Sequence, residues 1–192
     1  IIFLLVCLQG FFGWYMVSSG LVNRIDVSHY RLSIHLFTAF IILSIVFWNF
    51  LKLTQLQINQ ISIKSFFIKF FLVLLFMQLI IGAFVSGMDA GTIYNTWPLM
   101  GVSYFPDDSK IIEFLDITVF DNPSIVQFLH RNLAYLIMIV YIFLLISIFK
   151  ETNKIFRKPI LIIGISLFLQ VVLGILTILS GVKIIYASLH QI

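Results

Sequence analysis

The stretch that decides the fold covers residues 123–149 and reads PSIVQFLHRNLAYLIMIVYIFLLISIF. It is largely apolar, and roughly 20 such residues cross a bilayer core of about 30 Å as a helix. Its apolar residues do not alternate with the period of two that a membrane β-strand requires. The stretch therefore predicts a transmembrane α-helix, and it carries a histidine, His130, near its start.

The rest of the chain repeats this pattern. The 192 residues are 61% hydrophobic and 10% charged, whereas about half of a soluble domain is apolar. A sixth apolar segment begins near Lys183 and meets the end of the sequence, and four more full stretches cover residues 1–18, 30–50, 66–86 and 159–179. We therefore expect an all-α membrane protein. Because the sequence opens on Ile1 and stops within a predicted helix, we also expect it to be a piece of a longer chain.

The charges predict the orientation in the membrane. The loops at 51–65 and 150–158, together with Lys69, carry seven Lys or Arg against Glu151 alone, and the other side carries five basic and seven acidic residues. Basic loops stay on the cytoplasmic side, so the long segment 88–122 should face outward. Because the basic residues flank apolar spans, we do not expect binding to nucleic acid. A single cysteine, Cys7, excludes an internal disulfide and a cysteine-rich metal site.

An internal repeat is visible within the chain. Four residues recur at one offset of 161 positions: Gln9, Gly13, Ser19 and Gly20 match Gln170, Gly174, Ser180 and Gly181. Each copy is followed by a helix with a histidine, and Gln78 and Gly82 repeat the Gln-x3-Gly spacing a third time. Repeated units of membrane proteins commonly place sites within or between the copies. The glycines alone would be explained by close helix packing.

Three histidines lie at similar depth in helices that enter from the outer side. His35, His130 and His190 follow the expected helix starts by five to seven residues, which places them roughly 8 to 10 Å below the helix ends. An intramembrane histidine is a functional-site hypothesis by default. A haem iron held between two imidazoles fits this arrangement, whereas zinc prefers three or four close ligands and no acid lies in these spans.

The pairing of the histidines follows from the repeat. His130 and His190 both lie in the second half of the chain, so we expect them to be the axial ligands of one haem. His35 then lacks a partner, and the repeat predicts one about thirty residues upstream of Ile1.

Other residues allow two interpretations each. Arg131 and Arg31 could meet haem propionates or be interfacial anchors. We expect His29, at the mouth of its helix, to be solvated or to cap that helix. The segment 88–122 is long and could cover a cofactor, although its aromatic residues also suit the membrane interface.

At this point the residues resemble the haem A synthases of bacteria and mitochondria. The matching stretches lie within 13–20, 26–35, 82–99, 127–131 and 188–191, and they read GWYMVSSG, DVSHYRLSIH, MDAGTIYNTWP (88–98), QFLHR and SLHQ. They are spread over almost the full length of the chain. The run at 88–98 is the most specific because it is long and of unusual composition.

The resemblance implies eight helices in two pseudo-symmetric four-helix transmembrane halves, of which this chain would carry helices three to eight, the last truncated. Residues 1–51 would complete the first half, 52–64 would form an inner linker loop, and 65–192 would form the second half with its outer loop 88–122. The protein would lie in the bacterial inner membrane or, alternatively, the mitochondrial inner membrane.

The resemblance also implies the chemistry. A ring methyl of haem O would be oxidised to a formyl group, through successive hydroxylations and loss of water, to give haem A for cytochrome oxidase. His130 and His190 would ligate a haem b, with Arg131 beside it, and His35 with Arg31 would bind the substrate haem. The catalytic residues, a glutamate and a further histidine, would lie upstream of Ile1. The implied partners are haem O synthase as the source of substrate, an electron donor protein or quinol, and the lipid bilayer.

Two other functions use the same features. A two-haem b-type cytochrome would need the same histidines but would only pass electrons. A transporter built from repeats could use the histidines as a proton relay, and it would be colourless.

Overall fold

The computed structural model describes residues 1–20, 26–54, 65–152 and 154–191. The described part contains six α-helices, four short 3-10 helices and no named strand. Their bounds are α1 (Ile2–Gly20), α2 (His29–Leu53), α3 (Ser65–Gly87), η1 (Ala90–Thr92), η2 (Ile111–Leu115), η3 (Ile117–Asp121), α4 (Pro123–Lys150), η4 (Lys154–Phe156), α5 (Arg157–Leu179) and α6 (Ile184–Gln191). The prediction of an all-α protein is confirmed.

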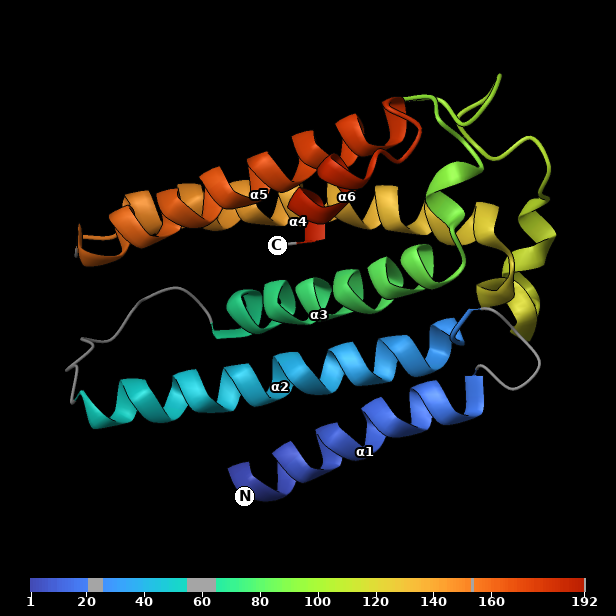
Figure 1. Ribbon diagram of the computed structural model, residues 1–192. Coiled ribbons are helices and arrows are strands. Elements are labelled where there is room, and N and C mark those ends of the chain that lie inside the picture. The colour runs from blue at the N-terminus through green and yellow to red at the C-terminus, as the bar shows by residue number, and fades with distance from the viewer. Residues whose placement is uncertain (21–25, 55–64, 153, 192) are drawn as a thin grey trace.

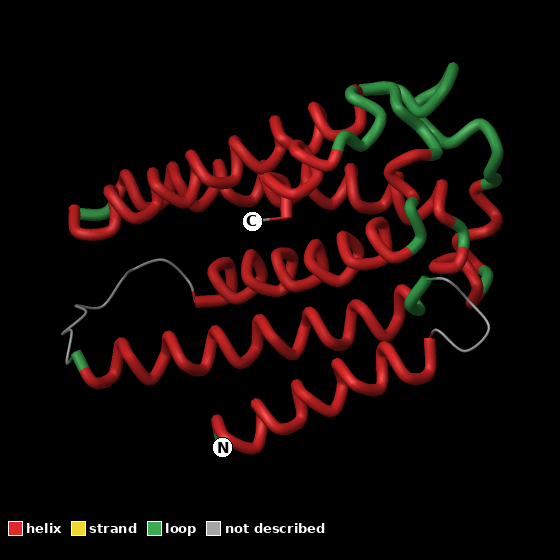
Figure 2. The backbone as a smooth tube through the Cα atoms, viewed as in Figure 1, coloured by secondary structure: helices red, strands yellow, loops and turns green. Residues whose placement is uncertain are grey.

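The helices run up and down, and each packs against the next one along the chain. The three helices that carry His35, His130 and His190 are α2, α4 and α6, and all three start at the same end of the bundle (Figure 1). The non-helical part of segment 88–122 gathers at that end, interrupted by η1, η2 and η3 (Figure 2). The histidines therefore lie near one end of the bundle, on the side of the long loop.

In the described part of the chain, four helices are long and apolar enough to cross a membrane. They comprise His29–Leu53, Phe66–Gly87, Pro123–Lys150 and Lys154–Leu179, while the apolar part of α1, Ile2–Ser18, is shorter. Many large apolar side chains are exposed on these helices, among them Phe47, Ile139 and Phe168. Such a surface is incompatible with water as the only solvent, so the chain is a multi-pass membrane protein. Of the five full spans predicted, the structure supports four by length and composition.

The starts and ends of the helices fix the depth of the histidines. At the start of α4, the Asn122 side chain accepts hydrogen bonds from the backbone N–H groups of Ser124 and Ile125 at 3.0 and 3.3 Å, and Pro123 takes a position that needs no N–H donor. At the end of α5, Gly181 adopts φ 70°, and the N–H groups of Gly181 and Val182 bond back to the last turn at 3.0 and 2.8 Å. This glycine termination turns the chain so that α6 packs back against α5.

The buried core lies mainly between α3, α4 and α5. One cluster contains Phe71, Leu74, Ile137, Tyr141, Leu144 and Ile160, and the Tyr141 hydroxyl donates to the Ile160 carbonyl at 3.0 Å. A second cluster of Ile81, Phe84 and Val126 lies near the loop end. Together these clusters hold α3 and α4 rigidly side by side, on either side of the level at which His130 lies.

Helices α2 and α3 approach each other closely at Gly87. A Cβ added at Gly87 would lie 2.9 Å from both Cα and Cβ of His29. This contact joins the two predicted halves of the protein. The proposed division into 1–51, 52–64 and 65–192 stays a prediction, because residues 55–64 lie outside the described residues.

We predict that Gly87→Ala destabilises the protein by about 1–3 kcal/mol, as overpacking typically does, because backbone cannot move aside as a side-chain tip can. Thermal unfolding in detergent measures the effect. The control is Gly10→Ala, since a Cβ at Gly10 would meet nothing within 4 Å. Equal melting temperatures for the two variants would contradict the prediction.

Candidate functional site

The centre of the candidate site is the pair His130 and His190. Their ring centroids lie 6.3 Å apart and the ring planes are perpendicular, at 90°. Two metal–nitrogen bonds of about 2 Å, plus about 1 Å from each nitrogen to its ring centroid, require about 6 Å between centroids. The two imidazoles therefore stand at the separation that one shared metal ion needs.

The hydrogen bonds of these rings show which ring nitrogens already have a partner within the protein. Nδ1 of His190 lies 2.9 Å from the backbone carbonyl of Gln170. Since that carbonyl can only accept, Nδ1 carries the proton and Nε2 keeps a free lone pair. Nδ1 of His130 is buried and has no hydrogen-bond partner. An unpaired buried polar atom costs about 1–3 kcal/mol, so the pair has ligand capacity that the protein itself does not use.

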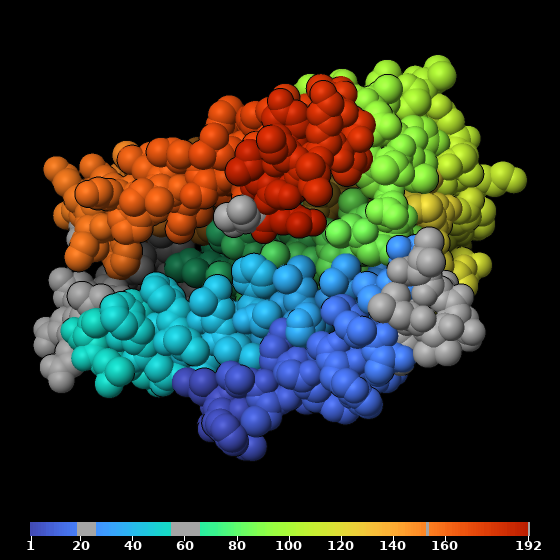
Figure 3. All heavy atoms as spheres, viewed as in Figure 1, coloured from blue at the N-terminus to red at the C-terminus, as the bar shows by residue number. Residues whose placement is uncertain are grey.

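The surroundings of the pair restrict the kind of metal group. In the described part of the chain, no three His, Cys, Asp or Glu side chains are close enough together to hold a metal ion. Helices α3 to α6 contain no Asp or Glu. A metal that takes two imidazoles and carries its remaining ligands with it is a haem iron, and the residues present fit that group. On the face in view, the surface is hollowed along α3, between α2 and α5 (Figure 3).

His35 lies apart from this pair, on α2 against α1. The Gln9 amide lies 3.2 Å from Nδ1 of His35 and 3.4 Å from Nε2, and it donates to the His35 backbone carbonyl at 3.0 Å. Within the described residues, no ring contact joins His35 to another histidine. The structure thus places two of the three predicted ligands together and the third alone.

Arg131 is buried, with 7% of its surface exposed, and its guanidinium binds the outer loop. It donates to the carbonyls of Thr96 at 2.9 Å, Leu99 at 3.4 Å and Tyr94 at 2.9 Å, while its Nε has no partner. The residue after His130 therefore ties segment 94–99 to α4. A contact with a haem propionate, as expected from the sequence, stays a prediction.

Further contacts hold the same loop over the start of α4. The Gln127 side chain donates to the Tyr94 carbonyl at 3.0 Å, and the Trp97 indole donates to the Tyr135 hydroxyl at 2.9 Å. Further along the loop, Asp108 accepts a hydrogen bond from the hydroxyl of Ser124, in the first turn of α4, at 2.7 Å. Desolvation acts to raise the pKa of Asp108, but hydrogen bonds from Ser124 and other neighbours outweigh it and hold that pKa below its usual value. The loop is thus bonded to the helix that carries His130.

Arg31, the other predicted propionate partner, contacts α1. Its guanidinium carbon lies 4.8 Å from the centroid of the Tyr15 ring, a cation–π geometry. In the structure Arg31 therefore fastens α2 to α1 close to His35.

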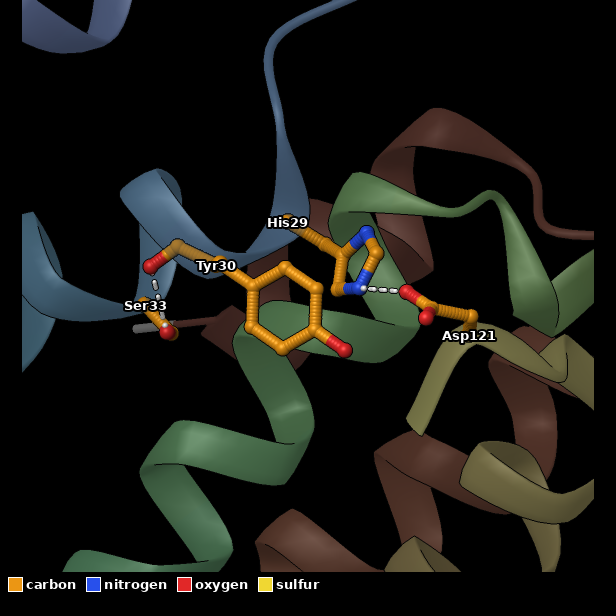
Figure 4. Close-up of polar contacts among 4 residues, drawn as sticks. All are labelled: His29, Tyr30, Ser33 and Asp121. Carbon is orange, nitrogen blue, oxygen red and sulfur yellow. Dashed lines mark hydrogen bonds and ion pairs between the residues drawn. The ribbon is translucent and has the colours of Figure 1, made fainter. Parts of the chain in front are cut away.

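The expectation for His29 was a solvated or capping side chain, and the structure gives it a different place. Its Nε2 lies 3.3 Å from a carboxylate oxygen of Asp121, and its side chain is 15% exposed. Its ring packs edge-on against Phe84, and Figure 4 shows it pointing from the start of α2 toward the loop. Sequence reasoning missed this because Asp121 is 92 positions away and nothing local marks the pair.

The side chain that sequence reasoning undervalued is Gln78. Its amide donates to the His130 carbonyl at 3.2 Å and lies 3.3 Å from Nε2 of the ring. The signal was present, because the Gln-x3-Gly spacing occurs three times, but two common residue types at one spacing did not indicate a contact with histidine.

Comparisons with known proteins agree with this geometry. The family model described as "Cytochrome oxidase assembly protein" matches residues 1–192. The chain is 48% identical over 191 residues to "Heme A synthase" of Pelagibacter ubique (strain HTCC1062), and this match covers 100% of the chain and 56% of that relative. It is 41% identical over 196 residues to "Heme A synthase" of Rickettsia bellii (strain OSU 85-389), covering 100% of the chain and 58% of the relative. No solved structure matches the chain.

The chain therefore belongs to the cytochrome oxidase assembly protein family, as the resemblance in its motifs implied. It spans a little over half the length of these curated relatives.

We predict that Arg131→Lys releases the outer loop, because an ammonium group cannot bind three carbonyls in the geometry of the guanidinium. Amide hydrogen exchange in segment 94–100 should speed up, while exchange in the middle of α4 stays slow. The control is Lys110→Arg, which changes an exposed cation elsewhere in the same loop. Unchanged exchange in 94–100 would show that Arg131 does not hold it.

Proposed function

We propose that the protein carrying this chain is a haem A synthase. It oxidises a ring methyl of haem O to a formyl group and so supplies haem A for cytochrome oxidase. The observation that carries the proposal is the 6.3 Å separation between the ring centroids of His130 and His190. The sequence repeat places His35 at a similar depth in its own helix. The two relatives reported above, whose names are "Heme A synthase", support the same reaction.

In this proposal, His130 and His190 would hold a haem b in the second half. A haem held in this way supplies one-electron redox chemistry. The backbone carbonyl of Gln170 orients His190 by fixing its proton on Nδ1. The loop bonded to Arg131 lies against α4 at the residue that follows His130.

His35 is the proposed ligand of the substrate, haem O, in the first half. Arg31, stacked on Tyr15 one helical turn before it, would meet a propionate at the interface. The catalytic glutamate and the second histidine belong to the part of the relatives' length that this chain does not span. We further propose that haem O synthase delivers the haem O. The electrons would come from a donor protein or from a quinol.

The protein is proposed to lie in the bacterial inner membrane with its histidine end outward. The basic loops at the other end of the bundle favour that orientation.

We predict that His130→Ala or His190→Ala in the full-length protein abolishes the low-spin absorption bands of the second-half haem. Each change removes one of two axial ligands. His29→Ala is the matched control, because His29 bonds to the loop and not to a proposed cofactor. Unchanged bands in either ligand variant would remove the ligand assignment.

We further predict that the full-length protein, expressed together with a haem O synthase, yields haem A when its pigment is extracted. His35→Ala should prevent this conversion while keeping the second-half bands. Recovery of haem O alone from the wild type would instead support the alternative, a two-haem b-type cytochrome that only passes electrons. A colourless protein would support the transporter.

A further inference from the structure

Each of the three proposed ligand histidines lies against the same two residue types of the preceding helix. These residues are four positions apart, on α1, α3 and α5, so that the contact occurs in three successive helix pairs. The three sets are Gln9 and Gly13 with His35, Gln78 and Gly82 with His130, and Gln170 and Gly174 with His190.

The glycines contact the imidazole rings and not a neighbouring backbone. A Cβ added at Gly13 would lie 3.1 Å from Cε1 of His35, and one at Gly82 would lie 3.1 Å from Cε1 of His130. At Gly174 the distance to Cε1 of His190 would be 2.9 Å. At all three glycines, the atoms of other elements that lie nearest to the added Cβ belong to the ring. At Gly87, by contrast, the nearest atoms include the backbone Cα of His29.

The glutamines hold the other side of the contact. The side-chain amides of Gln9 and Gln78 both donate to the backbone carbonyl of their histidine and also lie within 3.4 Å of a ring nitrogen. Gln170 uses its backbone carbonyl, which accepts from Nδ1 of His190. In each case the helix is fixed beside its ligand and one ring nitrogen has a polar neighbour.

The fourth histidine lacks this contact. Near His29, the glycine of α3 is Gly87, and the atoms that a Cβ there would meet first are Cα and Cβ of His29, not its ring. The ring itself turns toward Asp121. The contact with a Gln-x3-Gly pair thus separates the three proposed ligands from the histidine that has another role.

We propose that Gln-x3-Gly is a positioning element that sets the orientation of each haem-ligating imidazole. The glycine receives the Cε1 edge of the ring in all three pairs, and the glutamine bonds to the histidine through its side chain at His35 and His130 and through its backbone carbonyl at His190. This inference rests on the proposed function, because it takes the three histidines as haem ligands. It assigns a role to Gln78, Gly82 and Gly174 in the second half and to Gln9 and Gly13 in the first.

The tolerance of metal bonds makes this position sensitive. Metal–ligand distances hold to about ±0.2 Å, and a methyl group at 2.9–3.1 Å from the ring forces the ring to move by a few tenths of an ångström. A buried ring between two packed helices has little room to compensate. The shift of the imidazole is therefore at least as large as the variation seen in metal–ligand distances. The shift is larger at Gly174 than at Gly82, because the added methyl group would lie closer to the ring there.

The first experiment compares Gly82→Ala and Gly174→Ala with Gly10→Ala in the full-length, haem-loaded protein. Gly10 is a helical glycine with open space around it, and alanine favours helix more than glycine does. We expect the two ring-contact variants to lose most of their low-spin absorption and to shift the reduction potential of the second-half haem. The Gly10→Ala spectrum should match the wild type.

The second experiment separates positioning from folding by changing the glutamines, since Gln→Ala leaves more room and not less. Gln78→Ala removes both contacts with His130, so the spectrum and potential should shift. Gln170→Ala keeps the backbone carbonyl that bonds to His190, so the bands should be retained. Haem content and melting temperature are measured on the same samples.

The outcomes distinguish the two proposals. If the wild type shows no low-spin haem, the proposed function fails. If the wild type shows the haem and both Gly82→Ala and Gly174→Ala keep its spectrum and potential, the function stands and the positioning element is wrong. If only the melting temperature falls, the glycines serve helix packing alone, and the inference is overturned in the same way.

Discussion

The structure depends on one constraint: an imidazole in an apolar helix bundle must be oriented and satisfied by its neighbours, because neither water nor another polar solvent is available there. In this chain the neighbour is always the preceding helix. It supplies a glycine that leaves space for the ring and a glutamine that bonds beside it. Two of the rings then lie close together at right angles, and Nδ1 of His130 has no hydrogen-bond partner.

The fold could be predicted largely from the sequence because the bilayer leaves so few choices. A long apolar stretch must satisfy its own backbone, and so it forms a helix. The positions of α2 to α5 followed from this rule, and the common starting end of α2, α4 and α6 followed because successive membrane-spanning helices alternate in direction.

The site was only partly predictable. His130 and His190 were expected to pair because both lie in the second half and at similar depth in their helices, and the structure places their rings 6.3 Å apart. That they bind haem stays a prediction. The grip of Arg131 on the carbonyls of segment 94–99 did not follow. A loop carbonyl is the same chemical group at every position, so the sequence carries no mark of which carbonyl an arginine will bind. The contact between His29 and Asp121 was not predicted for a related reason. The two residues are far apart in the sequence, and only the course of the long loop brings them together.

That last pair matters for how the halves of the molecule fit together. His29 begins α2, the helix that carries His35, whereas Asp121 ends η3, directly before the capped start of α4 that carries His130. The backbone of His29 also packs on Gly87 of α3. The start of α2 is thus joined to η3 through one side chain and to α3 through one backbone contact. Because a contact at the start of a helix limits how far that helix can rotate or slide, this junction helps to hold α2, which carries His35, against the second half of the chain.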